Sequence, residues 1–271
     1  MRVEDLSEAY RIVDWMDNPY EESGRKRYLK ALQEFKQLVE HIWLKSLPPK
    51  VRVIDVCAGR GIGGVALARV LKETGHEVDL TLVDLRLDAL RDAEKFCADE
   101  NVKCKCVVKD AVKVHELGVF DAALLYGGPL AHFDAWSLLK MFASVSQSLN
   151  SNGVVIVEEM DRIYHIFREG FKDFIVETVS PERLTVSAHS GYDAFRDVYR
   201  RVMYEMKTGR AVEVELTFRS VATIASLLWI FFHDVDLIGK GERLYFIVGY
   251  KPRRRIQVED LREPPLLLRK K

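Results

Sequence analysis

The central part of the chain alternates short apolar runs with stretches whose apolar residues recur every three or four positions. Five such runs predict strands, at residues 51–56, 78–85, 104–108, 120–126 and 153–159. Helical spacing predicts helices after the first, second and fourth of these strands, of which the second carries Leu87, Leu90, Ala93 and Cys97 on one side. Strands that alternate with helices at this interval indicate βαβ units, in which right-handed crossovers build a parallel sheet covered on both faces.

Both flanks of this central part have a different pattern. Residues 1–49 are expected to be largely helical, because apolar positions step by three and four until Pro48 and Pro49 end the unit. After about residue 180, alternation of apolar and polar residues predicts antiparallel strands with one exposed face, at residues 183–189, 196–206 and 211–218. Ser220 then caps a predicted helix, and the turn at 239–241 predicts a hairpin at the edge of the sheet.

Composition narrows the classes of partner. The chain has 41 basic residues (Lys and Arg) and 41 acidic residues (Asp and Glu), so its formal net charge is zero. A neutral protein has no overall electrostatic attraction to nucleic acid or to an anionic membrane. Residues 1–15 are charged and have no apolar run of signal-peptide length, and no stretch of the sequence approaches the roughly 20 apolar residues of a membrane span. Its four cysteines lack paired CxxC spacing, which favours free thiols, no metal site and a cytoplasmic location.

The segment VIDVCAGRGIGG, residues 53–64, joins the first predicted strand to its helix. Glycines in such a turn let the backbone approach a ligand, because no Cβ stands in the way. Gly59, Gly61 and Gly64 also satisfy the GxGxxG spacing of dinucleotide sites. The spacing by itself leaves a nicotinamide cofactor, another ligand and a purely structural turn as alternatives.

Three acidic residues follow three successive predicted strands. Asp55, Asp84 and Asp110 stand near the carboxyl ends of the first, second and third strands. Because these ends meet at the edge where open α/β sheets bind ligands, we expect the carboxylates to lie along one rim. Such a rim suits an amino group, ribose hydroxyls and an adenine amine, whereas it repels the pyrophosphate of a nicotinamide cofactor. A helix cap for Asp84 and a solvated loop for Asp110 are the structural alternatives.

The glycine turn with these carboxylates resembles the motifs of class I S-adenosylmethionine-dependent methyltransferases of the small-molecule type. Asp55 matches the acidic position of the family's first motif, Gly59 and Gly61 match its second and third glycines, and Cys57 replaces the first. Asp84 matches the residue that binds the ribose, and Asp110 with Ala111 resembles the pair that reads adenine. The segment LLYGGPLAHF at 124–133 resembles the fourth motif, nearest the methyl group.

The resemblance implies a fold, a cofactor and a set of residues. It implies an α/β Rossmann-like sheet, mostly parallel with an antiparallel last strand, plus an antiparallel β insertion and N-terminal helices. It implies S-adenosylmethionine as cofactor, bound by Asp55, Cys57, Ala58, Gly59, Gly61, Ile62, Gly63, Asp84, Leu85, Asp110, Ala111 and Tyr126. The expected division is an N-terminal helical cap at 1–49, a cofactor-binding core at 50–180, an acceptor-side insertion at 181–219, the end of the core sheet at 220–252 and a C-terminal extension at 253–271.

The side of the methyl acceptor is less defined by the sequence. His132 follows Pro129 within the segment 124–133 and is a candidate general base, because a neutral imidazole accepts a proton near neutral pH. A histidine that only bonds the backbone at a helix entry is the alternative. His189, Tyr192 and Arg196, in SAHSGYDAFR, are candidates for contacting a small-molecule acceptor.

Two other functions remain as alternatives. An RNA or protein methyltransferase shares the motifs, but YGGPL lacks the Asn-Pro-Pro-aromatic clamp of enzymes that act on base amino groups. An NAD-dependent oxidoreductase is favoured only by the GxGxxG spacing. The balanced charge further disfavours a polyanionic substrate.

Overall fold

The computed structural model describes residues 3–269 and contains two β-sheets. The larger, seven-stranded sheet has the order β10-β11-β5-β4-β1-β2-β3. Its strands are β1 (Lys50–Val56), β2 (Glu77–Asp84), β3 (Cys104–Val108), β4 (Phe120–Leu125), β5 (Leu149–Met160), β10 (Phe232–Gly239) and β11 (Leu244–Pro252). The first five strands pair in parallel, whereas β11 runs antiparallel to both β5 and β10. This sheet confirms the fold class predicted from the sequence.

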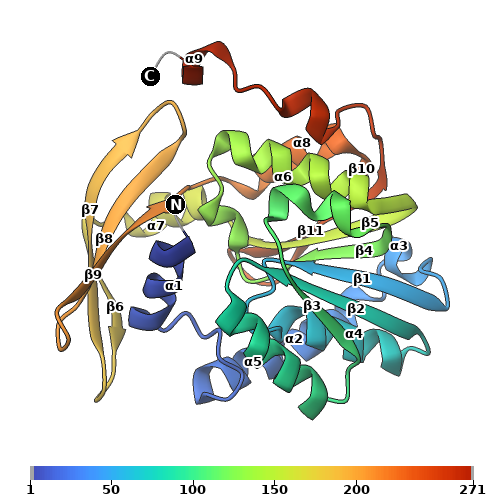
Figure 1. The fold of residues 1–271 in the computed structure, drawn as a ribbon, viewed down its shortest axis with the longest axis horizontal. Coiled ribbons are helices and arrows are strands. Elements are labelled where there is room, and N and C mark those ends of the chain that lie inside the picture. Colours follow the sequence, from blue (N-terminus) through green and yellow to red (C-terminus); the bar gives the residue numbers. More distant parts are fainter. Residues whose placement is uncertain (1–2, 270–271) are drawn as a thin grey trace.

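Helices cover both faces of the larger sheet (Figure 1). On one face lie α2 (Glu22–Leu38), α3 (Ile42–Lys45), α4 (Ile62–Glu73) and α5 (Leu87–Asp99); on the other lie α6 (Ala135–Ser148), α8 (Val221–Phe231) and the 3₁₀ helix η1 (Ala111–Leu117). Alternate residues of one strand serve the two cores, since Val53 packs toward α2 and α4 while Ile54 packs toward α6 and α8. Strands buried on both faces are what near-continuous apolar runs produce.

The smaller sheet is antiparallel and stands beside the larger one (Figure 1). Its strands, in spatial order, are β6 (Phe174–Val179), β7 (Leu184–Asp193), β8 (Val198–Glu205) and β9 (Arg210–Leu216). Helix α1 (Val3–Ile12) packs on it, with Ala9 and Ile12 against Met203, Val212 and Val214. The N-terminal segment therefore begins on the smaller sheet and continues to α2 on the larger one.

The sequence pattern did not identify α7 (Arg162–Glu169) or β6. Neither element contains a buried residue, and both are short, with eight residues in α7 and six in β6. The other elements are η2 (Pro129–His132), η3 (Val258–Leu261) and α9 (Leu266–Arg269). The division into five segments stays a prediction. Within residues 3–269, no helix combines the length and apolarity needed to cross a membrane.

Candidate functional site

The carboxyl edge of the larger sheet and the smaller sheet face a common cavity of about 1570 Å³. Its walls come from the N-terminal segment, the loops after β1, β2, β3 and β4, the end of β5 and strands β6, β8 and β9. Sites for single small ligands are usually about 300–1,000 Å³. This cavity therefore has room for a nucleoside-sized ligand and a second molecule beside it.

The glycine turn at the end of β1 is shaped by backbone that favours glycine. Gly59 and Gly61 have φ angles of +55° and +84°, in the left-handed region where a Cβ is strained. Cys57, which replaces the family's first glycine, adopts φ +62° despite its side chain. A Cβ at Gly64 would lie 2.7 Å from Asp55 Oδ2, so only glycine lets the helix amide approach this carboxylate.

Asp55 is buried and receives one hydrogen bond from this turn. The Gly64 amide donates to its Oδ2 at 2.8 Å, while its Oδ1 has no hydrogen-bond partner within residues 3–269. Burial raises the pKa of Asp55 to about 8, against the Gly64 hydrogen bond, and the nearby charge of Asp84 adds to the rise. The carboxyl is therefore ready to ionise when a cation approaches.

Asp84 fastens the turn to the next strand. Its Oδ2 accepts the Gly59 amide at 2.8 Å, and its Oδ1 accepts the Arg86 amide at 2.9 Å. The carboxylate thus fixes the backbone of two loops, and it does not cap α5, whose N-cap residue is Arg86. This is a function in addition to the ribose contact that the resemblance implies.

Asp110 caps η1, where its side chain accepts the Val112 amide at 3.1 Å. Asp110 is exposed, but it lines the same cavity as Asp55 and Asp84. The three carboxylates lie close enough to Cys57 that their charges, after burial, raise the pKa of its thiol. The structure therefore brings the three acidic residues to one rim.

Eleven of the twelve predicted cofactor residues line the cavity. They are Asp55, Cys57, Ala58, Gly59, Ile62, Gly63, Asp84, Leu85, Asp110, Ala111 and Tyr126. Gly61 is not in this lining, because its α-carbon faces α5; a Cβ there would lie 3.2 Å from the Ala93 Cβ. Gly61 therefore serves close packing of the turn on α5. Cofactor contact by each of these residues stays a prediction.

His132 lines the cavity from η2. Burial, together with the positive charges of Arg162 and Arg86, lowers its pKa to about 4, so the imidazole is neutral near pH 7. Its Nδ1 is buried and has no hydrogen-bond partner in the described part of the chain. His132 therefore has a nitrogen that can accept a hydrogen bond from a ligand, but its low pKa makes it a weak base.

The three predicted acceptor-binding residues do not line this cavity. His189 packs against the ring of Phe171 at 5.4 Å, and Tyr192 is half exposed near Asp197. Arg196 makes a bidentate pair with Glu215 and a further bond to Asp134. Their contact with an acceptor stays a prediction.

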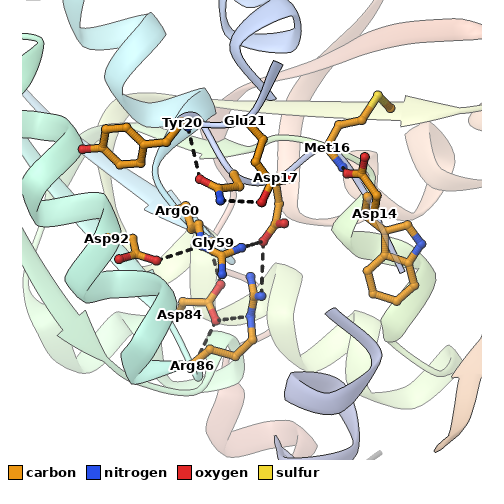
Figure 2. A network of polar contacts seen from close by, with 12 residues as sticks. Asp14, Met16, Asp17, Tyr20, Glu21, Gly59, Arg60, Asp84, Arg86 and Asp92 are labelled. Atoms are coloured by element: carbon orange, nitrogen blue, oxygen red, sulfur yellow. Dashed lines mark hydrogen bonds and ion pairs between the residues drawn. The ribbon is translucent and has the colours of Figure 1, made fainter. Parts of the chain in front are cut away.

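The N-terminal segment is tied over the glycine turn by ion pairs that the sequence did not reveal (Figure 2). The Asp17 carboxylate forms ion pairs with Arg60 and Arg86, with nitrogen–oxygen distances of 2.8 and 3.4 Å. Arg60 also forms an ion pair with Asp92, at 3.0 Å. The Arg86 guanidinium lies 3.6 Å from the centre of the Tyr10 ring. Because these charges are largely buried, each depends on its partners. The segment thereby forms one wall of the cavity.

Two consecutive glutamates at the end of β5 are further residues that the sequence did not single out. Glu158 is fully engaged, since its Oε2 accepts the Gly127 amide at 2.8 Å and its Oε1 pairs with Lys240. Glu159 accepts Arg162 at 3.1 Å through one oxygen only. Both residues line the cavity. An acidic pair at the carboxyl end of a predicted strand is the signal that would have found them.

Residues 53–153 match the family model described as "Methyltransferase domain". A comparison with curated proteins gave no match. Within the described residues, no three side chains of the types that ligate metals form a group that could hold an ion.

Solved structures share the fold. The chain is similar to PH0226 protein from Pyrococcus horikoshii OT3, with a TM-score of 0.64 and 18% identity, covering 91% of this chain and 99% of that one. An S-adenosylmethionine-dependent methyltransferase from Clostridium acetobutylicum ATCC 824 has a TM-score of 0.60 and 17% identity, with coverages of 81% and 91%. DesVI from Streptomyces venezuelae has a TM-score of 0.54 and 18% identity, with coverages of 91% and 96%.

At these identities the likeness establishes the fold, and the domain match supplies the enzyme class. Both findings agree with the prediction that the protein is a methyltransferase with S-adenosylmethionine as its cofactor. Residues 53–153 match a methyltransferase domain, and the chain shares the fold of solved S-adenosylmethionine-dependent methyltransferases; both findings are consistent with the class I family predicted from its sequence.

Proposed function

We propose that this enzyme transfers the methyl group of S-adenosylmethionine to a small molecule held between the two sheets. The observation that carries the proposal is the single cavity that joins the three carboxylates of the larger sheet to the inner side of the smaller one. The N-terminal segment, fastened by Asp17, closes one side of it. A site walled from three directions suits a small acceptor better than a strand of nucleic acid.

The residues present fit the cofactor. The unpartnered Oδ1 of Asp55 suits the amino group of its methionine part, and Asp84 suits the ribose hydroxyls. Asp110, with Leu85 and Ala111 beside it, suits the adenine amine and ring. When bound, the cofactor supplies a methyl group made electrophilic by a positively charged sulphur.

The chain itself contributes binding and orientation. Alignment of the attacking atom, the methyl carbon and the sulphur lowers the barrier most, so residues that hold both molecules matter more than a nucleophile. We propose His132, which is neutral and has a free nitrogen, as a hydrogen-bond acceptor for the substrate. A cytoplasmic location and the absence of a nucleic-acid partner remain part of the proposal, on the balanced charge and unpaired cysteines.

Replacing Asp84 tests the cofactor site. Asp84→Asn keeps an oxygen for the Gly59 amide but removes the charge, so adenosylhomocysteine should bind about tenfold more weakly or worse, as expected for hydrogen bonds to a charged acceptor of about 1.5–3 kcal/mol. Isothermal calorimetry measures the affinity. Asp79→Asn, on the same strand but half exposed at its far end, is the matched control. Unchanged affinity in Asp84→Asn contradicts the assignment.

Asp55 should make cofactor binding release a proton. Its carboxyl is mostly protonated at pH 6.5, because its pKa is about 8, and an ammonium group favours the ionised form. The affinity for adenosylhomocysteine should therefore rise as the pH increases toward 8. Calorimetry at pH 6.5 in buffers of different ionisation heat should show release of about one proton. Asp55→Asn should abolish it; release that persists in this variant assigns the proton to another group.

Asp17 should slow the exit of the cofactor. Asp17→Ala removes a partner from Arg60 and Arg86, and loss of hydrogen bonds to charged groups costs about 1.5–3 kcal/mol. We expect adenosylhomocysteine to dissociate at least about tenfold faster, measured by stopped-flow fluorescence. Glu22→Gln, whose carboxylate is solvent-exposed, serves as control. Equal dissociation rates in both variants mean that the segment does not close the site.

A further inference from the structure

Glu159 has a buried oxygen that no group among residues 3–269 contacts through a hydrogen bond. The side chain is only 2% exposed and stands next to last in β5, at the carboxyl edge of the sheet. Its Oε1 accepts the Met160 amide at 2.9 Å and Arg162 Nη2 at 3.1 Å. Its Oε2 has no hydrogen-bond partner within residues 3–269. A buried carboxylate oxygen without a donor is costly, so a bound molecule is the natural source of one.

The carboxyl group of Glu159 lies beside the loop after β4, which its other oxygen, Oε1, approaches. A Cβ at Gly128, whose φ is +70°, would lie 3.3 Å from Glu159 Oε1 and 3.0 Å from Arg162 Nη2. That loop follows β4, which lies between β1 and β5 in the sheet, so Glu159 lines the same cavity as the glycine turn. Glu158, one residue earlier, has both oxygens engaged, so the two neighbouring carboxylates differ in what they offer to a ligand.

The charged groups near Glu159 come from several elements. Arg162 and Glu158 act on its carboxyl in opposite directions, and Arg219 lies near it from the segment before α8. Burial is the largest influence, and it raises the pKa of Glu159. His132, in contrast, resists protonation because of burial and of Arg162. Of these two cavity-lining groups, Glu159 is the better acceptor of a proton.

We propose that the methyl acceptor is an amine whose N–H donates to Glu159 Oε2, and that Glu159 receives the proton released by methylation; this rests on the methyl transfer proposed above. An ionised carboxylate accepts hydrogen bonds only, so its partner must carry an N–H or O–H. A neutral amine already has a lone pair for attack. An alcohol, whose proton is held about as tightly as that of water, with a pKa of about 16, gains little from a carboxylate base.

Methyl transfer forms one nitrogen–carbon bond and breaks one carbon–sulphur bond, and the positive charge passes from sulphur to nitrogen. The nitrogen lone pair forms the bond to the methyl carbon as the carbon–sulphur bond breaks, and that electron pair stays on sulphur, which becomes a neutral thioether. The nitrogen, now positively charged, gives its N–H proton to Glu159. The carboxyl returns the proton to solvent when the products leave.

The other side chains that line the cavity indicate what kind of molecule carries the amino group. Phe171, Phe218, Leu216 and Met203 line it from the side of the smaller sheet. These four side chains supply apolar surface for a ring or hydrocarbon skeleton, while Glu177, Arg183 and Arg201 add charged groups to the same wall. The acceptor class is therefore an amine with an apolar part that contacts these four side chains and with its amino group directed to the end of β5.

Benzylamine and benzyl alcohol, which differ only in the amino and hydroxyl groups, test this inference. We expect the full-length enzyme saturated with adenosylhomocysteine to bind benzylamine at least tenfold more tightly than benzyl alcohol, by calorimetry. Glu159→Gln should lower the affinity for benzylamine at least tenfold and leave that for benzyl alcohol and adenosylhomocysteine unchanged. Glu182→Gln, an exposed glutamate at the rim of the same cavity, should change none of them.

Turnover separates proton transfer from mere support of the fold. With S-adenosylmethionine and benzylamine, Glu159→Gln should abolish methylbenzylamine formation while the variant still binds adenosylhomocysteine, and Glu159→Asp should restore part of kcat. If adenosylhomocysteine binds but the two probes bind equally or not at all, or Glu159→Gln keeps its kcat, the amine proposal is overturned and the cofactor proposal stands. If adenosylhomocysteine does not bind the wild type, the methyl transfer proposal fails.

Discussion

Two buried carboxylates hold the turn on which the site depends. Asp55 and Asp84 each accept a backbone amide of the glycine turn, from Gly64 and Gly59, at 2.8 Å. A buried backbone amide without an acceptor is costly, and each of these carboxyl groups satisfies one. These two bonds draw the first turn of α4 onto β1 and the loop onto β2, which keeps the edge of the sheet open. The two carboxyl groups thus hold the backbone of the glycine turn, which forms one wall of the cavity.

The second constraint is the path of the N-terminal segment. Helix α1 packs on the smaller sheet and α2 packs on the larger one, so the residues between them must cross the gap between the sheets. Arg27 donates to the backbone oxygen of Trp15 at 3.2 Å, and Asp17 pairs with two arginines of the larger sheet's loops. The crossing is therefore fixed at several points. Both sheets and this segment share one cavity, which links cofactor and acceptor in space.

Charges in this cavity are mostly paired, and the exceptions carry the functional information. Arg86 is shared between Asp84 and Asp17, and Lys240 between Glu34 and Glu158. Among the described residues of this cavity, one carboxyl oxygen each of Asp55 and Glu159 has no partner, as have His132 Nδ1 and Arg162 Nε. Of the two oxygens, that of Asp55 lies by the glycine turn and that of Glu159 at the end of β5, on the two sides of the strand β4 that separates β1 from β5. A cationic cofactor group and an amine acceptor would each meet one of them.

The sequence by itself determined the larger sheet, since apolar runs with intervening helical periods permit one kind of layered packing. It also placed Asp55, Asp84 and Asp110 at strand ends, and the topology of a parallel sheet then required them to share an edge. Only the tertiary structure decided that Gly61 packs on α5, that Arg196 is engaged by Glu215, and that Asp17 reaches Arg60. Such contacts join residues that are distant along the chain. The spacing of apolar residues predicts helices and strands, but it does not show which loops and helices contact one another in the folded protein. The free oxygen of Glu159 belongs to the same kind, because a missing partner is visible only when every neighbour has been placed.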